Sequence, residues 1–157
     1  MKISTHFVSF FIGFALVISP ALAQEKPADT MEIVREKMRA DKKLLVAEAM
    51  GLTEPEAKAF WPIYDSYQKD LAGLNTRMAK LIDDYAANYG NLTNEMAKKL
   101  LGELLSIRGD HVNLLKSYLP RFDQVLPGNK VIRYYQIESK IRAAVDYELA
   151  INIPISQ

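Results

Sequence analysis

The sequence contains no cysteine, which excludes disulfide bonds and a lipid-modified cysteine anchor. A chain without disulfides must hold its fold together by packing alone. Histidine is nearly as scarce, because His111 is the one histidine after residue 23. Transition-metal sites usually need several cysteine or histidine ligands at fixed spacing. The sequence therefore predicts no metal site and no cofactor.

Patterns typical of catalytic sites are also missing. The sequence has no glycine-rich phosphate-binding loop, and His111 has no evident nucleophile to activate, because Ser106 and Ser117 occupy ordinary helix positions. The acidic residues Asp83 and Asp84 are expected on an exposed helix face, where nothing would desolvate them. We therefore expect a binding protein and not an enzyme.

Long hydrophobic runs are absent except near the N-terminus. Lys2 precedes an apolar segment of about 12 residues, 7–18, which is followed by the small-x-small sequence Ala21-Leu22-Ala23. This segment is shorter than the ~20 residues of a membrane span. We expect residues 1–23 to be a cleavable secretory signal, which would leave no stable membrane anchor. An uncleaved anchor is the alternative.

Neither sign of charge dominates the sequence. Residues 1–23 carry one basic and no acidic residue, so 157 − 23 = 134 residues remain, with 20 − 1 = 19 Lys and Arg against 19 Asp and Glu. This balance, together with export, argues against nucleic acid as a partner. A chain of 134 residues has the size of one domain. We expect residues 24–157 to form a single all-helical domain.

The strongest pattern in the sequence is a heptad repeat between residues 60 and 85. Large side chains follow one another at alternating gaps of four and three, as in a coiled-coil seam, and polar residues lie between them. A long helix with so narrow an apolar seam needs helical partners. We therefore predict an all-α fold, an elongated helical hairpin or bundle of about four helices with no sheet. The seam consists of Phe60, Tyr64, Tyr67, Leu71, Leu74, Met78, Leu81 and Tyr85.

Capping and turn residues place the helix ends. Gly51 suits the left-handed residue that ends a first helix, and Thr53 with Glu56 forms a capping box that starts a second. Pro62 predicts a kink in the second helix, and Pro120 predicts a kink or an interruption in the third. The predicted helices cover about residues 30–50, 54–89, 94–119 and 130–150.

Two sides of the first predicted helix differ in character. Its buried side is predicted to carry Val34, Met38, Leu45 and Ala49. Basic residues recur at helical spacing on another side. That basic side is either a solvated face or a positively charged surface for unfolded chains or acidic partners. The basic residues are Arg35, Arg39 and Lys42 or Lys43.

Aromatic residues gather at two helix starts. Phe60, Trp61, Tyr64 and Tyr67 lie at the start of the second helix, and Tyr134-Tyr135 lie near the start of the last. They either form the wide end of the core, or leave Trp61 or one tyrosine of the pair exposed as a contact surface for apolar segments of other proteins. The last helix also carries Glu138 and Arg142, a favourable i, i+4 pair.

Two helix starts share a Leu-Thr sequence about forty residues apart, at Leu52-Thr53 and at Leu92-Thr93. In this respect the chain resembles the LTxxQ family of periplasmic proteins, which includes the Spy and CpxP stress proteins. Glu56 and Met96 stand where that family has glutamine. The segments Phe60–Tyr64 and Tyr135–Arg142 resemble an uncharacterised proteobacterial branch near the same family.

The resemblance implies an antiparallel helical hairpin that can pair into a curved homodimer in the periplasm. It also implies a role in envelope stress, either holding unfolded or partly folded envelope proteins without ATP or binding the periplasmic domain of a sensor protein. We expect the chaperone-like role; a non-chaperone adaptor or regulator, or a structural envelope protein, is the alternative. The candidate protein-binding surface consists of Arg35, Arg39, Lys42, Lys43, Trp61 and Tyr135.

Overall fold

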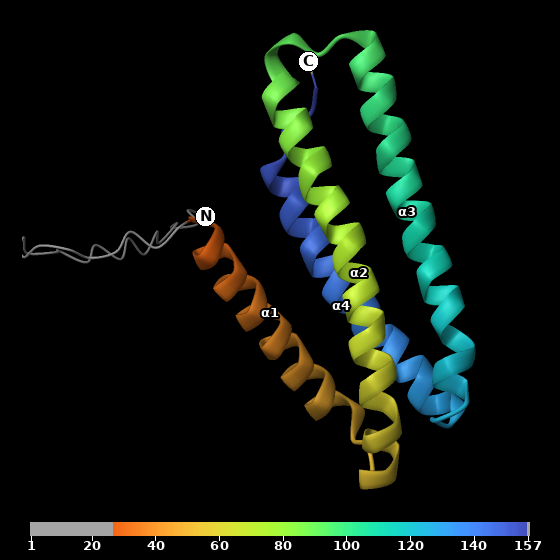
Figure 1. The fold of residues 1–157 in the computed structure, drawn as a ribbon. Coiled ribbons are helices and arrows are strands. Elements are labelled where there is room, and N and C mark those ends of the chain that lie inside the picture. Colours follow the sequence, from red (N-terminus) through yellow and green to blue (C-terminus); the bar gives the residue numbers. More distant parts are fainter. Residues whose placement is uncertain (1–26, 157) are drawn as a thin grey trace, which may run out of the picture. The chain divides into compact units, whose positions relative to one another are not determined.

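The computed structural model describes the backbone of residues 27–156 and the side chains of residues 37–156. This described part contains four α-helices and one short 3-10 helix, and no strand (Figure 1). The predicted all-α fold is therefore confirmed. The predicted signal, residues 1–23, lies outside the described residues. The elements are α1 (Pro27–Met50), α2 (Glu54–Asn88), the 3-10 helix η1 (Tyr89–Asn91), α3 (Asn94–Asp123) and α4 (Gly128–Asn152).

The chain divides into two compact units, Met1–Met38 and Arg39–Gln157. Within the predicted domain of residues 24–157, this boundary lies inside α1. The described part of the first unit is the helical segment 27–38. The second unit contains the rest of α1 and the other helices, and every described residue of the two hydrophobic clusters belongs to it.

The observed helix ends agree with the predicted ends to within two residues, except at the start of α1 and the end of α3. α1 begins at Pro27, three residues before the predicted start, because proline fits the first turn of a helix, where no backbone donor is needed. α3 does not end at residue 119. It continues through Pro120 to Asp123, and this last turn carries Phe122, which is fully buried.

Gly51 ends α1, as predicted. Gly51 has a φ of 54°, the left-handed conformation that glycine adopts without steric cost, and α1 ends directly before it. α2 continues through Pro62 to Asn88, and η1 then leads into α3. α2 and α3 form an antiparallel hairpin (Figure 1).

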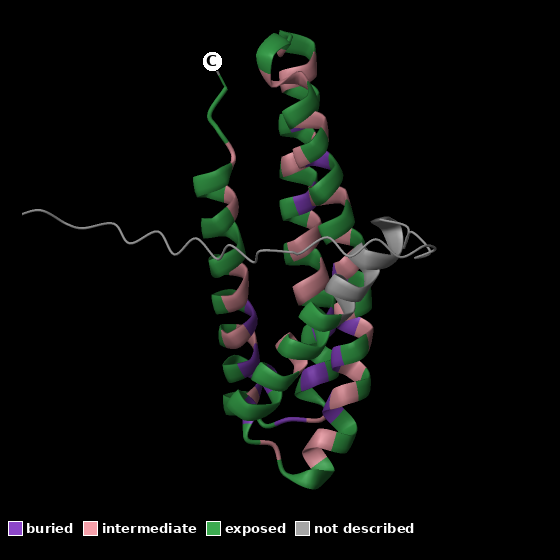
Figure 2. Cartoon of the chain, turned by 90° about the vertical axis from the view of Figure 1, so that its left-hand side faces the viewer, coloured by how far each residue is buried: buried purple, intermediate pink, exposed green. Residues whose placement is uncertain are grey.

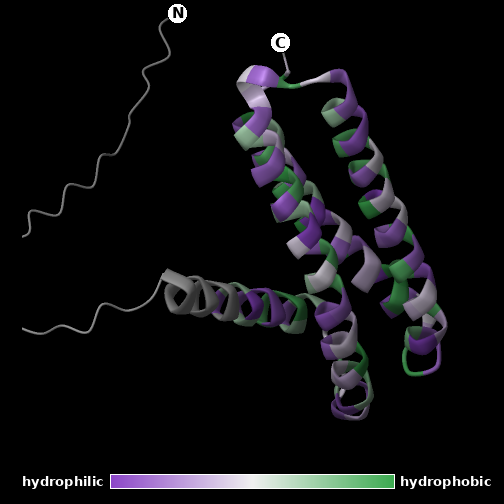
Figure 3. Ribbon diagram, turned by 45° about the horizontal axis from the view of Figure 1, so that its top comes forward, coloured by the Kyte–Doolittle hydropathy of each residue, from purple (hydrophilic) through white to green (hydrophobic). Residues whose placement is uncertain are grey.

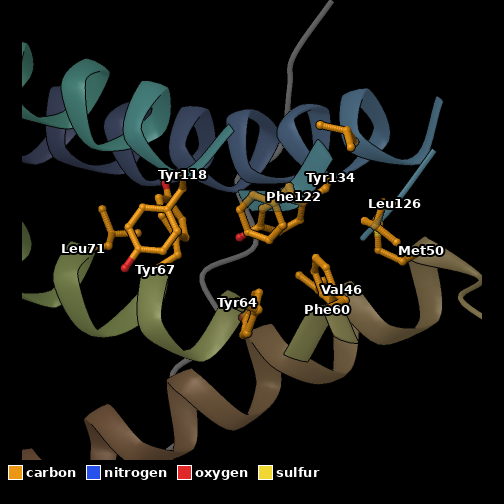
Figure 4. Close-up of a cluster of buried hydrophobic side chains, with 11 residues drawn as sticks. Val46, Met50, Phe60, Tyr64, Tyr67, Leu71, Tyr118, Phe122, Leu126 and Tyr134 are labelled. Carbon is orange, nitrogen blue, oxygen red and sulfur yellow. The ribbon is translucent and has the colours of Figure 1, made fainter. Parts of the chain in front are cut away.

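The larger of two hydrophobic clusters fills the end of the second unit where α1 joins α2. Half of the heptad seam lies in it, since Phe60, Tyr64, Tyr67 and Leu71 are at most 6% exposed. Figure 4 shows these side chains meeting residues of the other three helices. The partners are Val46 and Met50 from α1, Tyr118 and Phe122 from α3, Leu126 from the following turn, and Val131 and Tyr134 from α4.

A smaller cluster lies toward the other end of the hairpin. Its buried members are Leu81 of α2 and Leu100 and Ile107 of α3, and Met78 and Tyr85 pack against them. Figure 2 shows that buried residues are denser around the first cluster than around this one. Seven of the eight seam residues thus belong to or pack against clusters within the chain, so the seam is filled from inside.

The predicted buried side of α1 is wrong. Leu45 is 48% exposed and Met38 is 65% exposed, whereas Val46 and Met50 are fully buried. A shift of one residue turns a helix by 100°, and this rotation brings Lys42 and Lys43 against α2 and α4. Figure 3 shows both hydrophilic and hydrophobic residues on the coloured, C-terminal part of α1.

Candidate functional site

The first Leu-Thr helix start is a capping site that also binds a distant helix. The Glu56 carboxylate accepts hydrogen bonds from the Thr53 backbone N–H at 2.7 Å and from the Thr53 hydroxyl at 2.9 Å, which confirms the predicted capping box. The ammonium group of Lys130, in the first turn of α4, donates to the same carboxylate and to the carbonyl of Gly51. Leu52 packs against the larger cluster. Lys130 thus joins the end of α1, the start of α2 and the start of α4.

The Glu56 carboxylate at this junction stays ionised over a wide pH range. The hydrogen bond from Lys130, followed by those from Thr53, lowers the pKa of Glu56 from 4.5 to about 2. Above that pH, Glu56 is an acceptor for three donors at once.

The second Leu-Thr helix start repeats the cap without the charge. The Thr93 hydroxyl accepts from the backbone N–H of Met96 at 3.2 Å, and Leu92 packs against the smaller cluster. The side chain of Met96 has no carboxylate, so it cannot form a counterpart of the contact between Glu56 and Lys130. Each copy of the motif therefore places its leucine on a different hydrophobic cluster.

The basic residues of the candidate surface are turned partly inward. Lys42 donates to Glu138 at 2.8 Å and to Gln68 at 2.9 Å, and its side chain is 19% exposed. Glu138 is paired with Lys42 and not, as its i, i+4 spacing suggests, with Arg142. Lys43 pairs with Asp65 at 2.7 Å. These two lysines stabilise the contact of α1 with α2 and α4, and do not form an unpaired basic stripe.

The other members of the candidate surface are divided. The side chain of Arg35 lies outside the described residues, and Arg39 is exposed. Trp61 and Tyr135 are half-buried and pack against the larger cluster. Lys43 lies over the Trp61 ring, 5.1 Å from its centroid, and the Tyr135 hydroxyl donates to the carbonyl of Leu115 at 2.7 Å. Most of the aromatic residues therefore form the wide end of the core, and these two lie at its edge.

An apolar groove lies toward the end of the second unit where α2 leads into α3, and it was not predicted from the sequence. It has a volume of about 580 Å³ and is lined by α2, α3 and the C-terminal part of α4. Met78 and Ile82 line it from α2, Leu104 from α3, and Leu149 and Ala150 from α4. None of the described side chains of α1, residues 37–50, lines it.

One end of the groove carries charge. Arg108 of α3 and Arg142 of α4 line it there, together with Asp146. Arg142 and Asp146 are 4.0 Å apart, a long and weak contact. Three residues after Arg108 on α3, the pKa of His111 is lowered. The main cause is burial, which disfavours its charged form, and the second is the positive charge of Arg142.

The opposite end of the groove is closed by the C-terminal tail. Ile153 and Pro154 line the groove there. The Tyr85 hydroxyl donates to the carbonyl of Pro154 at 2.8 Å, and the Tyr89 hydroxyl donates to that of Ile155 at 3.1 Å. Two tyrosines of α2 and η1 thus hold the tail against the end of the hairpin.

The face of α3 next to the groove is apolar and exposed. Leu101, Leu105, Val112 and Leu119 are 56%, 59%, 47% and 40% exposed. Their spacings of four, seven and seven place them within about 40° of one another around the helix. We call these four residues the α3 strip. The signal that could have found it is the doubled leucines of α3, at 100–101 and 104–105, which give this helix more apolar width than one buried face needs.

Among residues 37–156, no group of three or more His, Asp or Glu side chains is placed to hold a metal ion. No helix in this part of the chain is long and apolar enough to cross a membrane. Comparisons with models of protein families, with curated proteins and with solved structures find no match to the chain.

Proposed function

We propose that the protein is a periplasmic, ATP-independent, chaperone-like protein that binds unfolded or partly folded envelope proteins. The observation that carries this proposal is the α3 strip. Contiguous exposed apolar patches with a polar rim are typical of protein interaction sites. The resemblance of the two Leu-Thr helix starts to the LTxxQ family supports the same function.

The charges around the α3 strip suit an unfolded client. Lys98, Arg108 and Lys116 lie within about 60° of Leu101 around the helix, and no acidic residue of α3 lies in this sector between Ala97 and Leu119. Such a surface would contact apolar segments through the strip and acidic side chains through its rim. Charge of one sign also raises the rate of encounter with acidic chains.

The test is suppression of aggregation of several denatured client proteins at near-stoichiometric ratios. We expect the double variant Leu105→Ser/Val112→Ser to lose most of the suppression, because it removes the centre of the strip. The matched control is Ile132→Ser/Val145→Ser on α4, where the side chains are 59% and 49% exposed, against 59% and 47% for the α3 pair. This control should retain suppression.

Two results would contradict the proposal. Failure of the wild-type protein to protect any client would exclude a chaperone-like role. Equal losses in the two double variants would show that general surface hydrophobicity acts, and not the strip. Capture of one specific envelope protein, with no protection of clients, would favour the adaptor function.

A further inference from the structure

We propose that the apolar groove binds a single-chain amphiphile with an anionic headgroup, of the fatty carboxylate class. The hydrocarbon chain would lie along α3 and α4, and the carboxylate would lie between Arg108 and Arg142. The groove adjoins the α3 strip at Leu101 and at Arg108 of its charged rim, but Leu105 and Val112, at the centre of the strip, do not line the groove.

The dimensions of the groove fit an extended chain. From Ala97 to Arg108 it follows α3 for eleven residues, which is about 17 Å at 1.5 Å per residue. The groove has a volume of about 580 Å³ over this length. A zigzag hydrocarbon advances about 1.25 Å per carbon, so a chain of about 14 carbons spans the groove.

The chemistry of the lining changes from one end of the groove to the other. The far end and the middle are formed by apolar residues such as Met78, Leu104 and Leu149, and the tail at Pro154 closes that end. A pocket that is mostly apolar with a few convergent polar groups is typical of small-molecule sites. The methyl end of a ligand would therefore lie under the tail.

Both arginines line the opposite end of the groove. Counted from the adjoining helix ends, Asp123 of α3 and Gly128 of α4, Arg108 lies 15 residues back and Arg142 lies 14 residues on, which is about 22 and 21 Å along the two helices. The two arginines therefore lie at nearly the same level. Among residues 37–156, no carboxylate forms an ion pair with Arg108, and Arg142 has one only at 4.0 Å. Both guanidinium groups have donors left for an anion.

The charge of Asp146 should weaken binding of an anionic headgroup, and this effect can be measured. Its carboxylate lines the same end of the groove, so it would repel an anionic headgroup while weakly pairing with Arg142. Removing this charge should strengthen binding of a carboxylate and leave binding of an uncharged amphiphile unchanged. A merely apolar groove would show no such difference.

The experiment measures binding of tetradecanoate and of tetradecanol to the full chain by isothermal titration calorimetry, below the concentrations at which these ligands aggregate. We expect one saturable site that prefers tetradecanoate. Arg108→Gln/Arg142→Gln should weaken tetradecanoate about tenfold, and Asp146→Asn should strengthen it about threefold. Neither change should alter tetradecanol binding by more than about twofold. Circular dichroism melting checks that each variant is folded.

A variant that fills the groove tests whether the hydrocarbon chain of the ligand lies there. Ala150 is exposed and lines the groove from α4, so Ala150→Trp should fill the groove without disturbing the core and abolish binding of both ligands. The proposal is overturned if neither ligand binds, if Ala150→Trp binds as the wild type does, or if the charge variants leave tetradecanoate binding unchanged. Equal affinity for both ligands also overturns it, because the charge of the headgroup then contributes nothing to binding.

Discussion

Glu56 connects three segments that lie far apart in the sequence. A glutamine at this position could still accept the Thr53 N–H, but it could not form an ion pair with Lys130. The ammonium group of Lys130 reaches the Glu56 carboxylate from 74 residues away. The same ammonium group also binds the carbonyl of Gly51 at the end of α1.

The depressed pKa of Glu56 predicts how stability depends on pH. Because the folded-state pKa of about 2 is below the unfolded value near 4.5, this contribution is complete above about pH 4.5 and is lost as pH falls toward 2. Glu56→Gln should melt at a lower temperature than the wild type at pH 7 and show a shallower fall between pH 5 and pH 2. Glu54→Gln, two residues earlier, is the control. Parallel melting curves for wild type and Glu56→Gln across this range would contradict the prediction.

The inward-facing pair of Lys42 and Glu138 predicts a second residue-level effect. The Glu138 side chain is 8% exposed, so Lys42→Met leaves a buried carboxylate with Gln68 as its remaining partner. Loss of one partner of a buried pair costs about 3 kcal/mol, whereas replacing both by apolar residues is often nearly neutral. Urea unfolding should therefore show that Lys42→Met/Glu138→Met is more stable than Lys42→Met alone. A double variant less stable than the single one would argue against this account.

α1 belongs to both units of the chain, and its contribution to the core comes from its C-terminal half. Val46 and Met50 are fully buried, and Lys42 supplies the ion pair to α4. Among residues 37–156, all members of the two hydrophobic clusters lie after Arg39. The second unit therefore contains every described residue of the core.

This division predicts which truncations fold. A chain that begins at Arg39 should melt within about 3 °C of residues 24–157, because it keeps every residue of the clusters. A chain that begins at Gly51 loses Val46 and Met50, and should lose about 4 kcal/mol of unfolding free energy, since burying each such side chain contributes about 1.5–3 kcal/mol. Calorimetry of the three chains checks both statements. Unfolding of the Arg39 chain would show that the first unit is needed.

The second unit as a whole uses its heptad seam for its own core. Phe60, Tyr64 and Tyr67 are at most 2% exposed, so they have no surface to offer a second chain. We expect light scattering at low micromolar concentration to give the mass of one chain. If the mass rises with concentration, the double variant Leu105→Ser/Val112→Ser should return it to the mass of one chain, because the α3 strip is the exposed apolar face of α3. A dimer that survives this double variant would contradict the prediction.

The sequence predicts the helices and the seam because these follow from local chemistry. Caps at Thr53 and Thr93, the turn at Gly51 and the spacing of the seam each depend on residues within a few positions of one another. The side of α1 that is buried depends on partners that are distant in the sequence, Asp65 and Glu138, and was predicted wrongly. The groove depends on how three helices are spaced, which no single helix encodes, so the sequence did not predict it.

The contact between Glu56 and Lys130 has a consequence for the order of folding. The hairpin of α2 and α3 closes over a short connection, but this contact requires α4 to return across 74 residues of chain. A contact that forms late is absent from the transition state, and its loss then accelerates unfolding and leaves the folding rate nearly unchanged. The junction of α1, α2 and α4 would then slow unfolding and so determine the lifetime of the folded chain.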